Sequence, residues 1–179
     1  LMVNVAVAFK SAFAGLKNLY LNVDDNGQLS SGYQVLGTWT VTATGPVNQP
    51  PVAVSVSPAS GSGSAQTFTV TASDPNGASD IAAVYFLVNA PPLNGAGACF
   101  VEYNRALNQF RLMVNAGNGW LGPISAGSSA TLSNSQCTLN GAGSTATSSG
   151  TTLTVSMAVV FNGSFAGAKN LYLNVDDNG

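Results

Sequence analysis

The stretch QTFTVTASDPNGASDIAAVYFLVN, residues 66–89, contains two strand patterns separated by a turn. In its first part, Phe68, Val70 and Ala72 alternate with threonines, which is the period-two pattern of a half-buried antiparallel strand. Its last part, residues 81–88, is apolar on both faces, as expected for a central strand. Between the two lies Asp-Pro-Asn-Gly, which is favourable turn chemistry. The stretch therefore predicts β-structure with one deeply buried strand.

The other apolar segments alternate in the same way, and none shows the 3.6-residue period of a helix over a dozen residues. Residues 99–103 and 109–115 flank NRALN and predict a hairpin. A further strand is predicted around residue 37, with one face formed by Tyr33, Val35, Trp39 and Val41. This pattern places Trp39 in or near the core. Strands at this spacing, with Gly, Asn and Ser turns, predict an all-β fold, an antiparallel β-sandwich.

The composition favours a location outside the cell. Hydrophobic residues make up 45% of the 179 residues, which is enough for a core. Charged residues make up only 7%, against the ~25% typical of soluble proteins. The polar surface must therefore come from Ser, Thr, Asn and Gln, as in many secreted and cell-surface bacterial proteins. We expect an extracellular or cell-surface protein.

The charged residues also argue against several functions. Five basic residues, no histidine and a net charge of −2 disfavour nucleic-acid binding, because neutralising phosphates requires clustered Lys and Arg. Without histidine the serines lack their commonest activating base, and the few acids cluster in turns. No apolar run approaches the ~20 residues that span a bilayer. We expect neither an enzyme, nor a nucleic-acid partner, nor a membrane span.

The two cysteines, Cys99 and Cys137, are too far apart for a CxxC redox motif, and without histidine they make a poor metal site. In a cytosolic protein they would be free thiols, whereas in an exported protein they would pair. We expect a structural disulfide.

The chain repeats itself over a long distance. Residues 1–27 align without gaps to residues 153–179, an offset of 152, and the two copies differ at 8 of 27 positions, which leaves 19 identical. The segment KNLYLNVDDNG is unchanged between the copies. The alternation of Val3, Val5 and Val7 predicts a strand that is repeated after residue 152. A period of 152 matches a whole domain rather than a solenoid unit.

The repeat also predicts domain boundaries. Residues 45–51 are the best linker, so residues 1–44 are expected to end one repeat and residues 52–179 to begin the next, which lacks its last strand. Either the chain is a slice of a longer tandem protein, which we favour, or one subunit completes its neighbour. The incomplete sheets predict partners that are copies of the chain or adjacent repeats. The assembly residues would be Tyr33, Val35, Trp39, Val41, Leu171, Leu173 and Val175.

Two stretches resemble a known family. PPVAVSVSPASGSGSAQTFTVTASDPNGASDIAAVYFLVN is similar to the opening half of bacterial immunoglobulin-like repeat domains, and FAGAKNLYLNVDDNG with QLSSGYQVLGTWTV resembles their final hairpin. The resemblance implies an Ig-like sandwich that serves as a non-catalytic structural repeat of a filament, stalk or long surface protein. The alternative is an adhesin or a carbohydrate-binding module of a secreted protein.

Two candidate ligand sites have simpler alternatives. Asp74, Asn76 and Asp80 supply the oxygens that calcium prefers, but the same residues also make a good turn, and calcium is the one cofactor we consider. The Asp-Asp-Asn-Gly sequence in each repeat copy is likewise favoured as a turn. Trp120 lies among small residues and could stack on a glycan, although a lone tryptophan more often closes the end of a sandwich.

Overall fold

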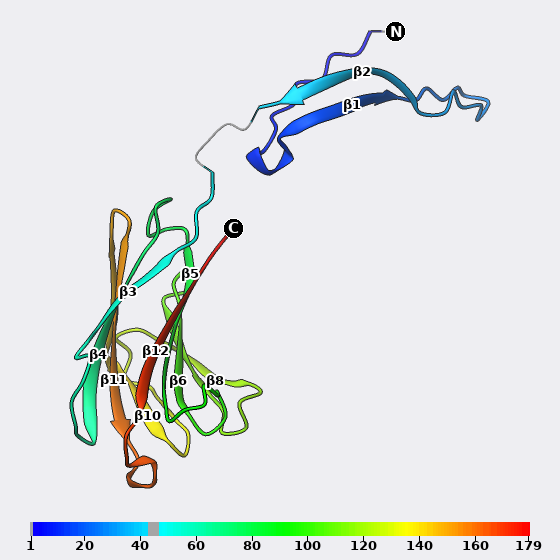
Figure 1. Cartoon of the computed structure of the whole chain (residues 1–179). Helices are drawn as coiled ribbons and strands as arrows, with labels where there is room; N and C mark the ends of the chain where they lie inside the picture. The colour runs from blue at the N-terminus through cyan, green and yellow to red at the C-terminus, as the bar shows by residue number, and fades with distance from the viewer. Residues whose placement is uncertain (1, 43–46) are drawn as a thin grey trace. The chain divides into compact units, whose positions relative to one another are not determined.

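The computed structural model describes residues 2–42 and 47–179 and is all-β, with every strand pair antiparallel (Figure 1). The chain forms two compact units, residues 1–47 and residues 48–179. Within the described residues there is no α-helix, only the short 3-10 turns η1 (Ser11–Phe13) and η2 (Gly163–Phe165). Part of the predicted linker, residues 45 and 46, lies outside the described residues.

The second unit consists of two five-stranded antiparallel sheets. The first sheet has the order β3 (Val52–Ser57), β4 (Ala65–Ser73), β11 (Thr152–Phe161), β10 (Cys137–Ser149) and β9 (Thr131–Ser133). The second has the order β12 (Asn170–Asp177), β5 (Ile81–Asn89), β6 (Cys99–Asn104), β7 (Gln109–Met113) and β8 (Trp120–Ser125). Side chains from both sheets form one core, so the predicted antiparallel, sandwich-like fold is confirmed.

Residues 66–89, which contain the two predicted strands, fold as their pattern predicts. Phe68, Val70 and Ala72 of β4 are buried, because the threonines between them take the outer face. On β5 the inward side chains are buried, and so are Ala83 and Leu87 on the outer face. The predicted hairpin is also present, with Asn104 of β6 opposite Gln109 of β7.

A disulfide joins the two sheets. Cys99 at the start of β6 bonds to Cys137 at the start of β10, and both residues are at most 1% exposed. The prediction of a structural disulfide is confirmed.

The described residues of the first unit, 2–42 and 47, contain one two-stranded sheet, β1 (Gly15–Leu21) with β2 (Gln34–Val41). A register shift after Leu19 sets Leu19 opposite Gly37 but Tyr20 opposite Val35. The prediction that Val35 and Trp39 share a face was wrong, because the extra residue in β2 reverses the alternation.

The placement of Trp39 in the core was also wrong. Trp39 is 58% exposed, and Tyr33 lies just before β2 and is exposed too. The physical reason is that the described residues of the first unit form no second layer against these two strands, so most of the apolar side chains of β1 and β2 remain open to water. Val41, at the end of β2, is buried.

The first copy of the repeated strand does not form. Residues 3–9 have no strand, and Val3 is 70% exposed, whereas its counterpart Val155 on β11 is fully buried. β11 lies between β4 and β10 and bonds to both. The described part of the first unit supplies no such neighbours, so the predicted strand at 3–9 was wrong although its pattern is that of β11.

Candidate functional site

The two repeat copies fold alike over short distances. Lys17 Nζ lies 4.7 Å from the centre of the Phe13 ring. In the second copy, Lys169 Nζ lies 4.5 Å from the centre of the Phe165 ring. In both copies the asparagine after the lysine donates to the hydroxyl of the tyrosine two residues later, at 3.3 and 3.1 Å. The shared sequence therefore encodes the same 3-10 turn in both places, and a strand follows it in each copy.

The first copy shows which edge of that strand faces β2. In an antiparallel strand, the N–H and C=O groups of alternate residues point to opposite edges. The Asp25 N–H donates to the Leu29 carbonyl, at 2.9 Å. The Ser31 N–H donates to the Val23 carbonyl, also at 2.9 Å. Odd-numbered residues of the first copy therefore point toward β2.

The second copy uses the opposite edge. The Asn178 N–H donates to the Asp80 carbonyl, just before β5, at 2.9 Å. Asn178 corresponds to Asn26, an even position of the first copy. The edge of β12 that matches the β2-facing edge of β1 is therefore turned away from β5. β12 is the last strand of its sheet, so no strand in the described residues pairs with this edge.

The side chains on β12 are already committed to the core. Leu171, Leu173 and Val175, which the repeat singled out as assembly residues, are partly buried and pack against the core of the second unit. The backbone N–H and C=O groups on the outer edge of β12, by contrast, have no partner strand among the described residues. An unpaired edge of this kind is a template for another strand.

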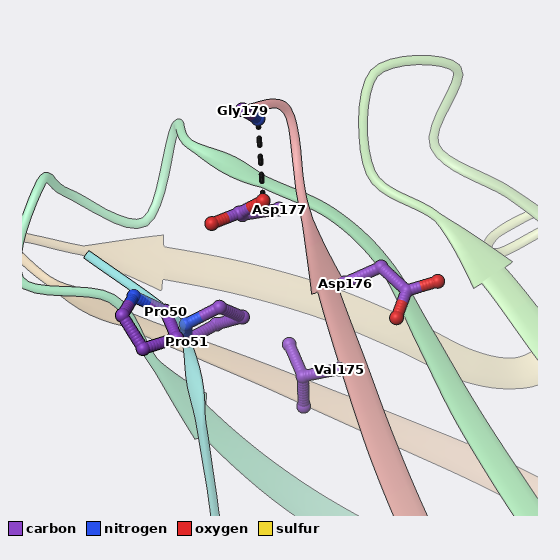
Figure 2. Close-up of a pocket in the computed structure, with 6 residues that line it drawn as sticks. All are labelled: Pro50, Pro51, Val175, Asp176, Asp177 and Gly179. Carbon is purple, nitrogen blue, oxygen red and sulfur yellow. Dashed lines mark hydrogen bonds between the residues drawn. The ribbon is translucent and has the colours of Figure 1, made fainter. Parts of the chain in front are cut away.

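A hollow lies at the far end of this edge. Figure 2 shows Pro50 and Pro51 facing Val175, with Asp177 and Gly179 at the rim. The Gly179 N–H donates to the Asp177 carboxylate at 3.2 Å. Neither proline has an N–H to offer a neighbouring strand, so the start of β3 does not close the edge of β12.

The connection before β3 is attached to the same end of β12. Asn48 Nδ2 donates to Asp177 Oδ2 at 3.0 Å, and the Gln49 N–H donates to Asn76 Oδ1 at 2.8 Å. Residues 48 and 49 of the predicted linker thus bond to the second unit.

The candidate calcium residues take different roles in one turn. Asp74 is fully buried, and its Oδ1 accepts the Asn76 N–H at 2.7 Å, while Oδ2 has no hydrogen-bond partner among the described residues. Asp80 contributes its backbone carbonyl to Asn178. No group of three acidic, histidine or cysteine side chains in the described residues could hold a metal. Calcium therefore stays a prediction.

The turn role of Asp74 gives a test. Replacing Asp74 by alanine removes the acceptor of the Asn76 N–H, and we expect the free energy of unfolding to fall by about 1–3 kcal/mol. Asp74→Asn keeps an acceptor oxygen and should lose less than half as much. Urea denaturation of the three proteins measures both losses. Equal losses would contradict the turn role.

Trp120 belongs to an aromatic cluster on the outer face of the second sheet. Its ring centre lies 5.2 Å from that of Phe100 and 6.4 Å from that of Tyr85, and all three side chains are partly buried. Tyr103, on the neighbouring strand β6, is only 3% exposed and cannot add to a stacking surface. Trp120 thus keeps a partly exposed ring, and its glycan role stays a prediction.

The sequence patterns did not single out the charged pair beside this cluster. Glu102 lies opposite both Tyr85 and Arg111, and Glu102 Oε2 is 3.5 Å from the guanidinium of Arg111. Burial raises the pKa of the Tyr85 phenol, with smaller contributions from the carboxylates of Glu102 and Asp176. Burial also raises the pKa of Tyr103. Cross-strand pairing, which needs the register, is what brings these residues together.

These tyrosines predict a loss of stability at high pH. Because the folded chain raises both phenol pKa values, the unfolded chain ionises first, at about pH 10. The free energy of unfolding should be at its full value below pH 10 and fall above it. Urea denaturation between pH 8 and 11 measures this fall, which should be smaller in the Tyr85→Phe/Tyr103→Phe variant. An equally steep fall in the variant would contradict the assignment.

No helix in residues 2–42 and 47–179 is long and apolar enough to cross a membrane. Comparisons with protein-family models, with curated proteins and with solved structures give no match to this chain.

Proposed function

We propose that the chain is a structural, non-catalytic Ig-like repeat unit of an extracellular bacterial filament, stalk or long surface protein. The observation that carries the proposal is the duplicated segment: its 3-10 turn, its lysine over a phenylalanine ring and a following strand recur in both copies, and no strand in the described residues pairs with the outer edge of β12. A repeat that leaves a strand unpaired is suited to joining the next repeat or the next subunit.

Two further properties support this function. The Cys99–Cys137 disulfide fits a secreted or extracellular protein, because such bonds persist in oxidising compartments. The low content of charged residues, 7%, suits close-packed repeats, which would otherwise repel one another.

Electron microscopy of the native material tests the proposal. We expect regular fibres whose repeat equals one or two domain lengths. Dispersed particles that bind glycan would overturn it.

The partly exposed aromatic cluster favours one alternative, an adhesin or a carbohydrate-binding module. Trp120, Tyr85 and Phe100 would then form the stacking surface. Titration with soluble glycans, using Trp120→Ala as the comparison, distinguishes the two functions, because filament assembly does not need this ring.

A further inference from the structure

We propose that the outer face of the second sheet binds a neutral, gluco-configured polysaccharide. Glu102 and Arg111 hold two adjacent hydroxyls of one sugar ring, while Trp120 packs against the face of the ring. The inference rests on the glycan-binding alternative above, gives its ligand class and adds its polar contacts, and it does not depend on filament formation. All the residues that it uses lie on β5 to β8, in the interior of the chain.

One row of outward side chains on these strands is apolar. Leu87 of β5 lies opposite Phe100 of β6. Met113 of β7 lies opposite Trp120 of β8. Leu87 and Met113 are buried. Phe100 and Trp120 keep part of their rings exposed, and their ring centres are 5.2 Å apart. The row therefore offers aromatic surface to a ligand above a closed apolar layer.

The adjacent row of outward side chains is polar. Glu102 lies two residues from Phe100 along β6, so the two rows are about 7 Å apart. On the neighbouring strands, Tyr85 and Arg111 lie opposite Glu102. Tyr85 links the two rows, because its ring centre lies 6.4 Å from that of Trp120. One surface thus carries aromatic rings beside a carboxylate and a guanidinium.

Glu102 is the only glutamate in the chain, and its carboxylate lacks a donor. The residue is 7% exposed, and Oε2 accepts no hydrogen bond within the described residues. Arg111 Nη1 lies 3.5 Å from Oε2, beyond the about 2.7–2.9 Å of a charge-assisted hydrogen bond. A buried oxygen without a donor destabilises the fold, so a ligand that brings a donor to this oxygen is bound more tightly.

The pair of opposite charges favours a neutral ligand with adjacent hydroxyls. Glu102 only accepts hydrogen bonds and Arg111 only donates them. The Arg111 side chain is 37% exposed, so a small outward movement of this side chain uncovers Oε2. One hydroxyl then donates to Oε2, while its neighbour on the same ring accepts from the guanidinium. A sugar ring has such adjacent hydroxyls, whereas a charged ligand would meet one attractive and one repulsive group.

The aromatic row distinguishes sugars by the shape of the ring. In β-1,4-linked glucose all the ring hydroxyls are equatorial, so both faces of the ring carry only C–H groups. Such a face lies against an aromatic side chain without burying a hydroxyl. In β-1,4-linked mannose an axial hydroxyl interrupts one face. The site therefore favours the gluco configuration.

The outer face of the first sheet shows that a sheet of this chain can be covered without aromatic or charged residues. Thr71 of β4 lies opposite Thr154 of β11, and Thr69 lies opposite Ser156. The hydroxyls of Thr69 and Ser156 are 3.0 Å apart and bond to each other. A face covered by hydroxyls suits a chain in which 7% of the residues are charged. The second sheet departs from this pattern, which indicates a binding surface.

Calorimetric titration of the full chain with cellohexaose tests the site. We expect saturable binding of this β-1,4-linked glucose hexasaccharide. Trp120→Ala should weaken the binding at least about tenfold, because the ring contact is lost. β-1,4-Mannohexaose should bind the natural chain at least about tenfold more weakly, because its axial hydroxyl would be buried without a partner.

The two arginines of the chain provide matched variants. Arg111→Met removes the donor but keeps an apolar stem, and the affinity should fall at least about tenfold. Arg105→Met makes the same change in the turn after β6, beside a hollow lined by Tyr103 and Ser148, and should bind as the natural chain does. Because Arg111→Met leaves a carboxylate unpaired, Glu102→Gln/Arg111→Met is the second variant and should lose affinity to a similar extent.

Urea denaturation of each variant separates a loss of binding from a loss of folding. A folded chain without saturable cellohexaose binding overturns the site. Equal affinities of the Arg105→Met variant and the folded Arg111 variants overturn the polar contacts, and equal binding of the two hexasaccharides overturns the gluco configuration.

The site and the structural function can fail separately. Native fibres that bind no sugar would reject the site and leave the structural function intact. Single particles that bind cellohexaose would reject the structural function and leave the site intact.

Discussion

Replacing Phe86 by alanine should lower the free energy of unfolding of the second unit by about 3–5 kcal/mol. Phe86 is 1% exposed and lies at the centre of the core, where its ring centre is 5.0 Å from that of Phe68 on the opposite sheet. Truncation removes this contact and leaves a cavity between two sheets held by many strand pairs, which cannot collapse to fill it. Because domains are stable by only about 5–15 kcal/mol, the variant should be close to unfolding.

The measurement must report on the second unit alone. The chain has two tryptophans, one in each unit, so a Trp39→Phe background leaves Trp120 as the only indole signal. Urea denaturation in this background should show the large loss for Phe86→Ala. Leu107→Ala, at a residue that is 58% exposed, is the control and should change stability by less than about 0.5 kcal/mol. A loss below 1 kcal/mol for Phe86→Ala would contradict the packing described here.

Removing the disulfide should be similarly costly, at about 4 kcal/mol. Cys99 and Cys137 are separated by 38 residues, and opening a loop of that length returns conformational entropy to the unfolded chain. The bond also joins the two sheets, so its loss removes a covalent link across the core.

The Cys99→Ala/Cys137→Ala variant tests this cost without leaving a free thiol. Its urea midpoint should fall well below that of the oxidised chain, and the reduced natural chain should behave in the same way. A variant as stable as the oxidised chain would show that the bond contributes nothing to folding.

Several features of the fold could be predicted from residue patterns because they depend on near neighbours or on burial. The alternation of β4 and the doubly apolar β5 follow from which faces are buried. The disulfide could be predicted because the low content of charged residues indicates an exported protein, in which two cysteines pair. The β6–β7 hairpin could be predicted because a short polar turn separates two apolar runs.

Other features could not be predicted because they depend on register and on distant partners. The extra residue in β2 places Val35 and Trp39 on opposite faces, and no residue type marks that shift. The pairing of Glu102 with Arg111, and the place of Tyr85 beside them, follow from the strand order together with the register of β5, β6 and β7. The fully buried Asp74 likewise becomes visible only when the sheets cover its turn.

The duplicated segment shows which features the local sequence determines and which depend on the tertiary structure. In both copies the sequence by itself determines a 3-10 turn and a lysine over a phenylalanine ring, because these contacts lie within a few residues. Tertiary structure decides whether the apolar segment that precedes this turn forms a strand. Val155 is fully buried between two partner strands, while Val3 is 70% exposed without them. Strand formation needs hydrogen-bond partners from elsewhere in the chain, and only the fold supplies those partners and determines which edge stays open.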